Sequence, residues 1–297
     1  MTLLVAPVEQ TLIAPVTRVE TSASLPARRW DPRIYQIATL GCLLAYGIGW
    51  LGFDVEPRTA AIILGTVLVA QATAAHVTRT RFEPRSALIS GLSLCLLLRT
   101  GSPELAAAAA VLAIAGKFLL RVGGKHVFNP TNGALIAMLL LTDQVWVSPG
   151  QWGSTAIFAF LLASAGGLVV NRAARADVTW AFLGAHAGLL VTRSLWLGDP
   201  VVIPLHRLAS GALVLFAFFM ISDPRTTPDS RAGRILFAIL VAVGGSLIQF
   251  RLFQTNPLLW SLAVCSLAVP LIDRLLPGRH YEWAAPGPGR RRERSPS

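Results

Sequence analysis

Charged residues are scarce in this sequence of 297 residues, since only 14% are Asp, Glu, Lys or Arg, whereas 54% are hydrophobic. A soluble globular protein carries about 25% charged residues. The shortage therefore predicts that much of the surface faces lipid. The net charge is +11, yet the basic residues form short clusters between apolar runs and build no basic face. No nucleic-acid recognition motif accompanies them, so nucleic acid is not an expected partner.

Cysteine is also rare, and the usual catalytic signatures are missing. Cys42, Cys95 and Cys265 each lie inside a hydrophobic run without paired or metal-ligand spacing, which is typical of small packing residues. The sequence shows no metal-ligand cluster, hydrolase triad, P-loop or dinucleotide fingerprint. These absences give no support to a soluble hydrolase, an NTPase or a metalloenzyme, and no metal is expected.

Long apolar segments fill most of the chain and predict an all-α membrane protein. A helix needs about 20 residues to cross the hydrocarbon core. The segments are 34–53, 60–77, 87–98, 105–120, 134–147, 156–170, 178–196, 208–221, 235–248 and 258–272. Lys and Arg concentrate at every second connection, which predicts about ten spans with both termini in the cytoplasm.

This pattern divides the chain into three parts and places it in the inner (cytoplasmic) membrane. Residues 1–32 are expected to form a cytoplasmic arm, residues 33–276 the ten-helix transmembrane domain, and residues 277–297 a basic disordered cytoplasmic tail. The apolar stretches of the arm are broken by Pro and charged residues and precede its arginines, so they do not have the order of a signal peptide.

The third and eighth apolar segments are too short to cross the membrane comfortably. They occupy corresponding positions in two halves of five spans, and an odd number of spans gives the halves opposite orientations. Short or broken helices at matching positions of inverted repeats are typical of a binding site near the membrane midplane. Tilted helices or local thinning of the bilayer would explain the same lengths without a repeat.

Two polar loops hold most of the candidate site residues. In residues 123–133, Asn129 is a natural N-cap, and Pro130 fits the first turn of the helix that follows. Such a helix start, beside basic residues, suits a phosphate or carboxylate, although it is equally a well-capped helix with a basic neighbour. The candidate binding residues of this loop are Lys125, His126, Asn129, Thr131 and Asn132.

The second polar loop is residues 222–234, and its first acid, Asp223, directly follows an apolar run. An acid there can bind a cation, pair with Arg225 or form an Asx-turn. We assign Asp223, Thr226 and Thr227 to a candidate ion or substrate pathway. His186 joins them because it is an ionisable residue inside a predicted span, although a histidine that bonds a neighbouring helix is the commoner case.

At these loops the sequence resembles the NqrB/RnfD family of membrane subunits from sodium-pumping NADH:quinone reductase and Rnf ferredoxin:NAD oxidoreductase. Residues 117–133, with Phe128-Asn129-Pro130, are similar to the family's Gly-Lys/His-Asn-x-Phe-Asn-Pro element. Residues 205–273 are closer still. They carry, in the family's order, the motifs Leu205-His206, Ser210-Gly211-Ala212, Phe218-Phe219-Met220-Ile221-Ser222-Asp223-Pro224, Gly233-Arg234-Ile235 and Pro270-Leu271-Ile272-Asp273.

The resemblance implies two inverted five-helix repeats and flavin-linked electron transfer coupled to ion translocation. The sequence departs from the family pattern at one point. In the electron-carrying members that it resembles, a Ser-Gly-Ala-Thr-type box carries FMN on its threonine. Here Ser210-Gly211-Ala212 is followed by Leu213. Covalent FMN is therefore not expected, and a noncovalent flavin, FMN or riboflavin, is the cofactor that the resemblance leaves open. Lys125 would then meet the flavin phosphate or a partner.

Three functions fit these observations. The first is an RnfD/NqrB-like electron-transport subunit without covalent FMN, at most one part of a membrane oxidoreductase and bound to a partner subunit. The second is a transporter or channel for a small solute or ion with no redox role. The third is a scaffold that anchors a biosynthetic or redox partner through basic cytoplasmic loops. The sequence names neither the ion, the substrate nor the partner.

Overall fold

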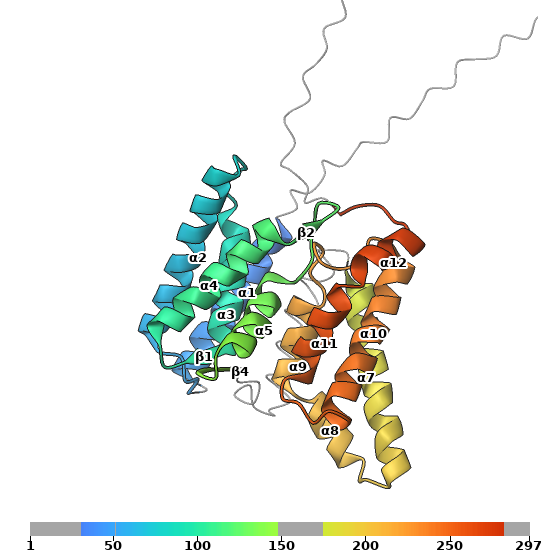
Figure 1. The fold of residues 1–297 in the computed structure, drawn as a ribbon. Coiled ribbons are helices and arrows are strands. Elements are labelled where there is room, and N and C mark those ends of the chain that lie inside the picture. The colour runs from blue at the N-terminus through green and yellow to red at the C-terminus, as the bar shows by residue number, and fades with distance from the viewer. Residues whose placement is uncertain (1–30, 51, 148–174, 282–297) are drawn as a thin grey trace, which may run out of the picture. The chain divides into compact units, whose positions relative to one another are not determined.

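A computed structural model describes residues 31–281 with the exception of residue 51 and residues 148–174 (Figure 1). The sixth predicted segment, residues 156–170, lies outside the described residues, as do residues 1–30 of the predicted arm and residues 282–297 of the predicted tail. The described chain is mainly helical, as the apolar segments predict. The other nine predicted segments all overlap helices, but the fifth extends past α5 into β4, and the eighth begins only where α8 ends.

The first half of the described chain contains five helices and four very short strands. The helices are α1 (Pro32–Gly49), α2 (Pro57–Val77), α3 (Pro84–Leu97), α4 (Pro103–Leu119) and α5 (Pro130–Leu141). The strands are β1 (Leu98–Thr100), β2 (Arg121–Val122), β3 (Lys125–His126) and β4 (Val145–Val147). Each of these helices has a proline in its first turn. The missing N–H of proline costs nothing there, so the prolines fix where the helices begin.

The second half contains two long helices and two bent pairs. The long helices are α7 (Ala176–Leu197) and α10 (Arg231–Phe250). One pair joins α8 (Val202–Leu208) at 48° to a segment made of α9 (Gly211–Leu215) and the π-helix η2 (Phe216–Met220). The other joins α11 (Pro257–Ser266) at 51° to α12 (Val269–Leu275).

Small residues allow the helices to approach closely. Helix α4 packs against α2 and α5, and its alanines Ala106, Ala109, Ala110 and Ala113 are fully buried. In the second half of the chain, Gly244 of α10 lies against Ser261 of α11. A Cβ on this glycine would come within 2.5 Å of the serine Oγ. Close packing through small side chains is typical of membrane helices.

The third segment ends early because the chain turns into β1, which pairs antiparallel with β4 after α5. Arg99 in β1 is buried, and its Nη1 donates to the carbonyl oxygens of Cys95 (3.0 Å) and Leu98 (2.7 Å). The guanidinium therefore satisfies carbonyls at the C-terminal end of α3, where the helix dipole favours a cation. A short helix can thus end inside the protein.

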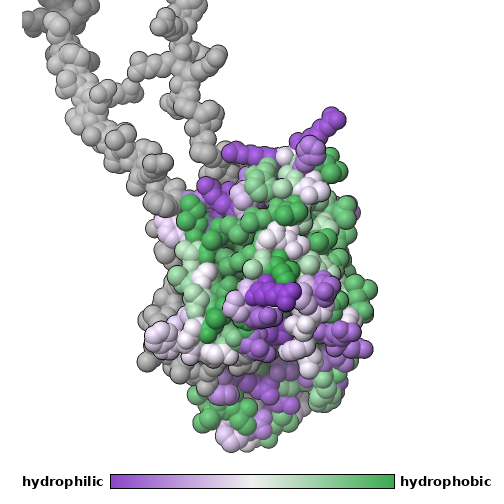
Figure 2. Space-filling model, turned by 90° about the vertical axis from the view of Figure 1, so that its left-hand side faces the viewer, coloured by the Kyte–Doolittle hydropathy of each residue, from purple (hydrophilic) through white to green (hydrophobic). Residues whose placement is uncertain are grey.

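Among the described residues, α2 and α10 are long and apolar enough to cross a membrane, and the count rises to four if each bent pair forms one span. The shorter apolar helices α3 and α5 have 14 and 12 residues. This does not confirm ten spans. Large apolar side chains are exposed on α7 and α10, among them Trp180 and Leu247. Figure 2 shows a broad hydrophobic area, interrupted by hydrophilic residues, on the side where α2 lies.

Candidate functional site

The two polar loops singled out in the sequence meet in the structure. Asn129 Nδ2 lies 3.4 Å from Asp223 Oδ2 and 3.4 Å from the carbonyl oxygen of Met220. Asn129 is also the N-cap of α5, because its Oδ1 accepts from Asn132 N at 3.1 Å. Both ends of this amide are thus occupied, one by its own helix and one by the Asp223 loop. The predicted N-cap and the predicted position of Pro130 are confirmed.

Asp223 organises a tight turn at the end of η2. Its Oδ1 accepts from Arg225 N at 3.0 Å, which is the Asx-turn anticipated from the sequence. Its carbonyl oxygen accepts from the backbone N–H groups of Thr226 and Thr227 at 3.1 Å each, and both threonine hydroxyls donate to it as well. Burial raises the pKa of the Asp223 carboxyl above its ordinary value. The threonines shape the turn, so their assignment to an ion pathway stays a prediction.

A small polar cavity lies where the loops meet. It has a volume of about 70 Å³, and its polar lining includes Lys117, His126, Asn129, Thr131 and Asp223. Lys117 is buried within α4, and its Nζ donates to Gln71 Oε1 of α2 at 3.1 Å. A space of this size holds a few water molecules or a small ion. It is too small for the ring system of a flavin.

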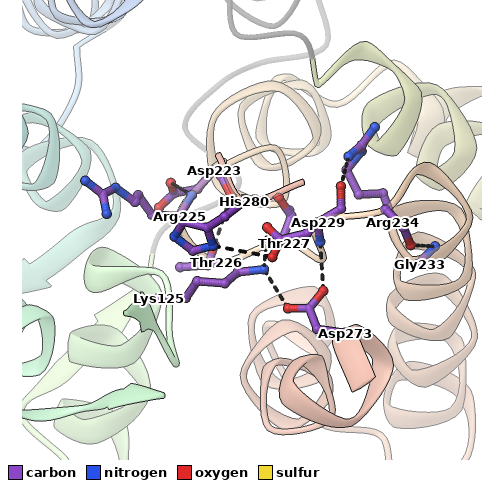
Figure 3. A network of polar contacts seen from close by, with 11 residues as sticks. Lys125, Asp223, Arg225, Thr226, Thr227, Asp229, Gly233, Arg234, Asp273 and His280 are labelled. Atoms are coloured by element: carbon purple, nitrogen blue, oxygen red, sulfur yellow. Dashed lines mark hydrogen bonds and ion pairs between the residues drawn. The ribbon is translucent and has the colours of Figure 1, made fainter. Parts of the chain in front are cut away.

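Lys125 sits at the centre of a second polar group, shown in Figure 3. Its Nζ lies 2.7 Å from Asp273 Oδ2 and 3.1 Å from Asp229 Oδ1. Asp273 Oδ1 accepts in turn from Asp229 N at 2.8 Å, and His280 Nδ1 lies 3.4 Å from Asp229 Oδ2. The contacts connect the hairpin formed by β2 and β3 with α12 and with the loop before α10.

A larger cavity adjoins this ion-pair group, and we call it the Lys125 cavity. Its volume is about 340 Å³. The polar side chains that line it are Lys125, His126, Asp229, Ser266, Asp273, Arg274 and His280. The backbone can approach closely at Gly123, which has a φ of +57° in the turn between β2 and β3. The cavity therefore offers cations, carboxylates and imidazoles to a single occupant.

The structure places the predicted site residues in different parts of the molecule. His126, Asn129, Thr131 and Asp223 line the polar cavity, while Lys125 and His126 line the Lys125 cavity. Asn132 is fully buried, and its Nδ2 donates to the carbonyl oxygen of Leu259 in α11 at 3.1 Å, which ties α5 to α11. His186 lines a third cavity. A ligand at Lys125 would have to share its ammonium with two carboxylates.

Sequence reasoning missed Lys117 and Asp273 as members of these groups, and it offered the carboxylate of Asp229 either to a ligand or to a helix cap. Asp273 carries the same signal as Asp223, because each acid directly follows an apolar run. By its position in the sequence, Lys117 belongs with the basic residues around the fourth connection. Nothing in its local sequence shows that its ammonium reaches Gln71 on another helix.

Residues 141–282 match the protein-family model described as the NQR2, RnfD, RnfE family. The matched stretch is 142 of the 297 residues, so slightly less than half of the chain is similar to this family. The matched part includes the Asp223 loop, Asp229 and Asp273, whereas Lys125 and Asn129 precede it. This similarity, together with the apolar helices, points to a membrane location.

Curated relatives carry names from the same family. The chain is 36% identical over 127 residues to a subunit of the ion-translocating oxidoreductase complex of Alcanivorax borkumensis, covering 41% of this chain and 36% of the relative. It is 40% identical over 80 residues to the corresponding subunit of Tolumonas auensis, and this match covers 26% of this chain and 22% of the relative. A subunit of the proton-translocating ferredoxin:NAD(+) oxidoreductase complex of Clostridium ljungdahlii is 35% identical over 97 residues, covering 33% and 26%. The matches thus span about a third or less of these relatives.

His126 makes the stability of the protein depend on pH. Burial, and then the nearby charges of Lys117, Arg121 and Arg225, lower the pKa of its imidazole to about 3. In the unfolded chain the pKa is about 6.5. As the pH falls below 6.5, the unfolded state takes up a proton that the folded state does not bind. Stability is therefore full above pH 6.5 and is lost progressively as the pH falls toward 3.

We expect thermal unfolding in detergent, followed by tryptophan fluorescence, to show this loss between pH 7.5 and pH 5.5. The contribution of His126 should be about 1 kcal/mol over this range. The variant His126→Gln should lose less stability over the same range than the unchanged protein. Equal losses in the two proteins would mean that His126 is accessible and protonated in the folded state.

Proposed function

We propose that this protein is a membrane-embedded electron-transport subunit that works within a multi-subunit oxidoreductase and whose activity is coupled to ion transport. Two lines of support are the family of residues 141–282 and the relatives named as subunits of ion-translocating and proton-translocating oxidoreductase complexes. The single structural observation behind the proposal is the polar centre formed where the 123–133 loop meets the 222–234 loop. It joins the two halves of the chain through charged and amide groups.

For the architecture, we propose ten spans in two inverted five-helix repeats in the inner membrane, with both termini in the cytoplasm. The third and fifth segments are short helices, and the eighth and tenth are bent pairs, so irregular helices recur at matching positions. Both α5 and α11 begin at the proline of an Asn-Pro pair, Asn129-Pro130 and Asn256-Pro257, and they run in opposite directions (Figure 1). Both features are expected of inverted repeats.

The Lys125 cavity is the site that we propose for a noncovalent flavin. Its volume of about 340 Å³ lies within the range of roughly 300–1,000 Å³ for small-molecule sites. Its carboxylates can accept hydrogen bonds from the hydroxyls of a ribityl chain, but they repel a phosphate. The charges of Asp229 and Asp273 therefore favour riboflavin over FMN. A bound flavin would supply the electron acceptor and donor at this end of the protein.

In this site each residue has a definite role. Lys125, held by Asp229 and Asp273, would present a fixed positive charge to the flavin, and His280 would add a donor beside Asp229. Among the described lining residues there is no Phe, Tyr or Trp side chain to stack on the ring. Covalent attachment is still not expected, because the sequence has no Ser-Gly-Ala-Thr-type box.

The proposal predicts that deletion of the gene lowers ferredoxin- or NADH-dependent electron transfer in membranes of its host. Reintroducing the unchanged gene should restore the rate. Asp273→Asn should restore it less than half as well, because the carboxylate that fixes Lys125 is lost. Asp143→Asn, which neutralises an exposed carboxylate beyond α5, is the matched control and should restore it fully. An unchanged rate after deletion would contradict the redox role.

Transport without redox chemistry is the second candidate, and the polar cavity favours it. A space of about 70 Å³ beside Asp223 and Asn129 suits a small, largely dehydrated ion. This alternative predicts ion flux in liposomes that contain the purified protein alone. The flux should disappear in Asn129→Ala, since that side chain connects α5 to the Asp223 loop. Flux without any flavin would favour transport over the redox role.

A further inference from the structure

A third cavity lies between α7, the bent pair of α8 with α9–η2, and the start of α11, and we call it the His186 cavity. Its volume is about 560 Å³, which is within the usual range for small-molecule sites. The walls contributed by α9, η2 and α11 are mostly apolar, with Leu213, Phe216 and Leu258 among them. One side of a prospective ligand must therefore be hydrocarbon.

Three of the six polar residues that line the cavity come from α7 and α8, which pack together, and the other three are Ser210, Gln249 and Asn256. His186 of α7 and both His206 and Arg207 of α8 line it. No Asp or Glu is among the described lining residues. Asp199 pairs with Arg193 at 3.8 Å and does not line the cavity. The polar side therefore offers nitrogen donors and a positive charge without a carboxylate to balance it.

His186 shows that the cavity is more than a packing gap. Its side chain is 94% buried, since the relative exposure is 6%, and its Nδ1 has no hydrogen-bond partner among the described residues. The ring is fixed by stacking on Phe182, with centroids 5.6 Å apart and planes 13° apart. A buried polar atom without a partner is costly unless something satisfies it. An acceptor atom on a ligand would supply the missing hydrogen bond.

The backbone around the cavity is irregular in the way that functional sites often are. The π-helix η2 contributes Phe216 and Met220 to the lining, and single-turn π-helices occur frequently at functional sites. Asn256 also lines the cavity with a left-handed φ of +56°, and its side chain does not cap α11. Its amide therefore remains available to a ligand beside the start of that helix.

We propose that the His186 cavity binds a single-chain amphipathic anion, such as a long-chain carboxylate, with its hydrocarbon chain along α9, η2 and α11. The acidic head is held by Arg207 together with the imidazoles of His186 and His206. The inference does not depend on the redox role proposed above. In a membrane the chain gains little by leaving lipid for protein, so the head contacts determine the affinity and the positive charge of Arg207 is decisive.

The test uses the full-length protein in nanodiscs of phosphatidylcholine, with a photoreactive diazirine analogue of palmitate as the probe. Illumination and peptide mapping should place the label on residues 186–190, 212–220 or 257–259. Oleate should compete for labelling, and methyl oleate, which has the same chain but no charge, should not. Equal competition by the ester, or labelling spread evenly over the lipid-facing helices, would overturn the proposal.

Variants separate the head contact from general effects on the fold. Arg207→Gln should lower labelling about tenfold at low probe concentration, as expected for the loss of one charge-assisted hydrogen bond. Arg193→Gln is the matched control and should change labelling less than twofold. Both guanidinium groups lie over the Phe250 ring, at 4.0 Å for Arg193 and 5.3 Å for Arg207, but only Arg207 lines the cavity. Equal effects of the two variants would contradict the assignment.

Two further arms complete the design. If Arg207→Gln does not fold, His186→Phe keeps an aromatic ring against Phe182 and should still reduce labelling at least threefold. Phosphatidylglycerol is added as a second competitor to identify the source of the anion. Competition by oleate alone identifies a free carboxylate, and competition by both identifies one acyl chain of an anionic lipid. Each result supports the anionic amphiphile, whereas competition by neither contradicts it.

Discussion

Lys125→Met is expected to destabilise the protein by about 3–5 kcal/mol, the usual cost of removing one partner from a buried ion pair. The side chain of Lys125 is 8% exposed, and the carboxylates of Asp229 and Asp273 are 12% and 20% exposed. Without the ammonium, two partly buried carboxylates face each other. Methionine keeps the apolar stem of lysine, so the loss reports mainly the charge. Thermal unfolding in detergent measures it.

Two further variants make this prediction specific. Arg121 lies in the same hairpin, but it is exposed and has no ion pair among the described residues. Arg121→Met should therefore lower the free energy of unfolding by less than about 0.5 kcal/mol. Adding Asp273→Asn to Lys125→Met should recover part of the lost stability, because one uncompensated charge is removed. If Lys125→Met and Arg121→Met unfold at the same temperature, the two carboxylates do not depend on Lys125.

Arg234→Ala should lower the free energy of unfolding by a similar amount, about 3–5 kcal/mol. Arg234 Nε donates to Asp177 Oδ2 at 2.9 Å and Nη1 donates to the carbonyl oxygen of Asp229 at 2.7 Å. One guanidinium thus connects the beginnings of α7 and α10 with the loop that holds Asp229. Its removal leaves the Asp177 carboxylate without its partner and releases the loop.

Arg231→Ala provides the comparison, because Arg231 lies one turn earlier in α10, is exposed and has no hydrogen bond or ion pair among the described side chains. Its substitution should cost less than about 0.5 kcal/mol. The same unfolding assay applies to both variants. A loss for Arg234→Ala as small as that for Arg231→Ala would show that the α7–α10 connection does not depend on the guanidinium.

The positions of most helices can be predicted from the sequence, because a helix that crosses a membrane needs a long apolar run. Apolar runs of the required length mark the helices, and the prolines that open α2, α4 and α5 mark their first turns. The Asn129 cap and the Asx-turn of Asp223 were also predictable, since each forms within two or three residues of its own backbone. Local geometry of this kind needs no knowledge of distant contacts.

The rest of the site could not be predicted because it depends on contacts between distant segments. Lys125 reaches Asp229 and Asp273 across 104 and 148 residues of sequence, and Lys117 reaches Gln71 across 46. One sequence contains the residue types but does not show these pairs. On its charge alone Lys125 is a candidate phosphate ligand, whereas in the structure two carboxylates hold that charge.

The bends of the helices show the same limit. The eighth segment is recognisably short, but its division at Ala209 and Ser210 and the π-helix that follows have no signal in the apolar pattern. The tenth segment differs, because Pro270 in the first turn of α12 is a sequence signal for its 51° bend.

The central claim is that the protein carries a noncovalent flavin as part of a membrane electron-transport complex. The visible absorption spectrum of the protein, gently purified in detergent with any partner retained, tests it most directly when it is repeated on the supernatant after acid precipitation. The account predicts a flavin spectrum that moves entirely into the supernatant and chromatographs as riboflavin. A colourless protein would contradict the claim and favour transport or scaffolding, and colour that stays with the precipitate would contradict noncovalent binding.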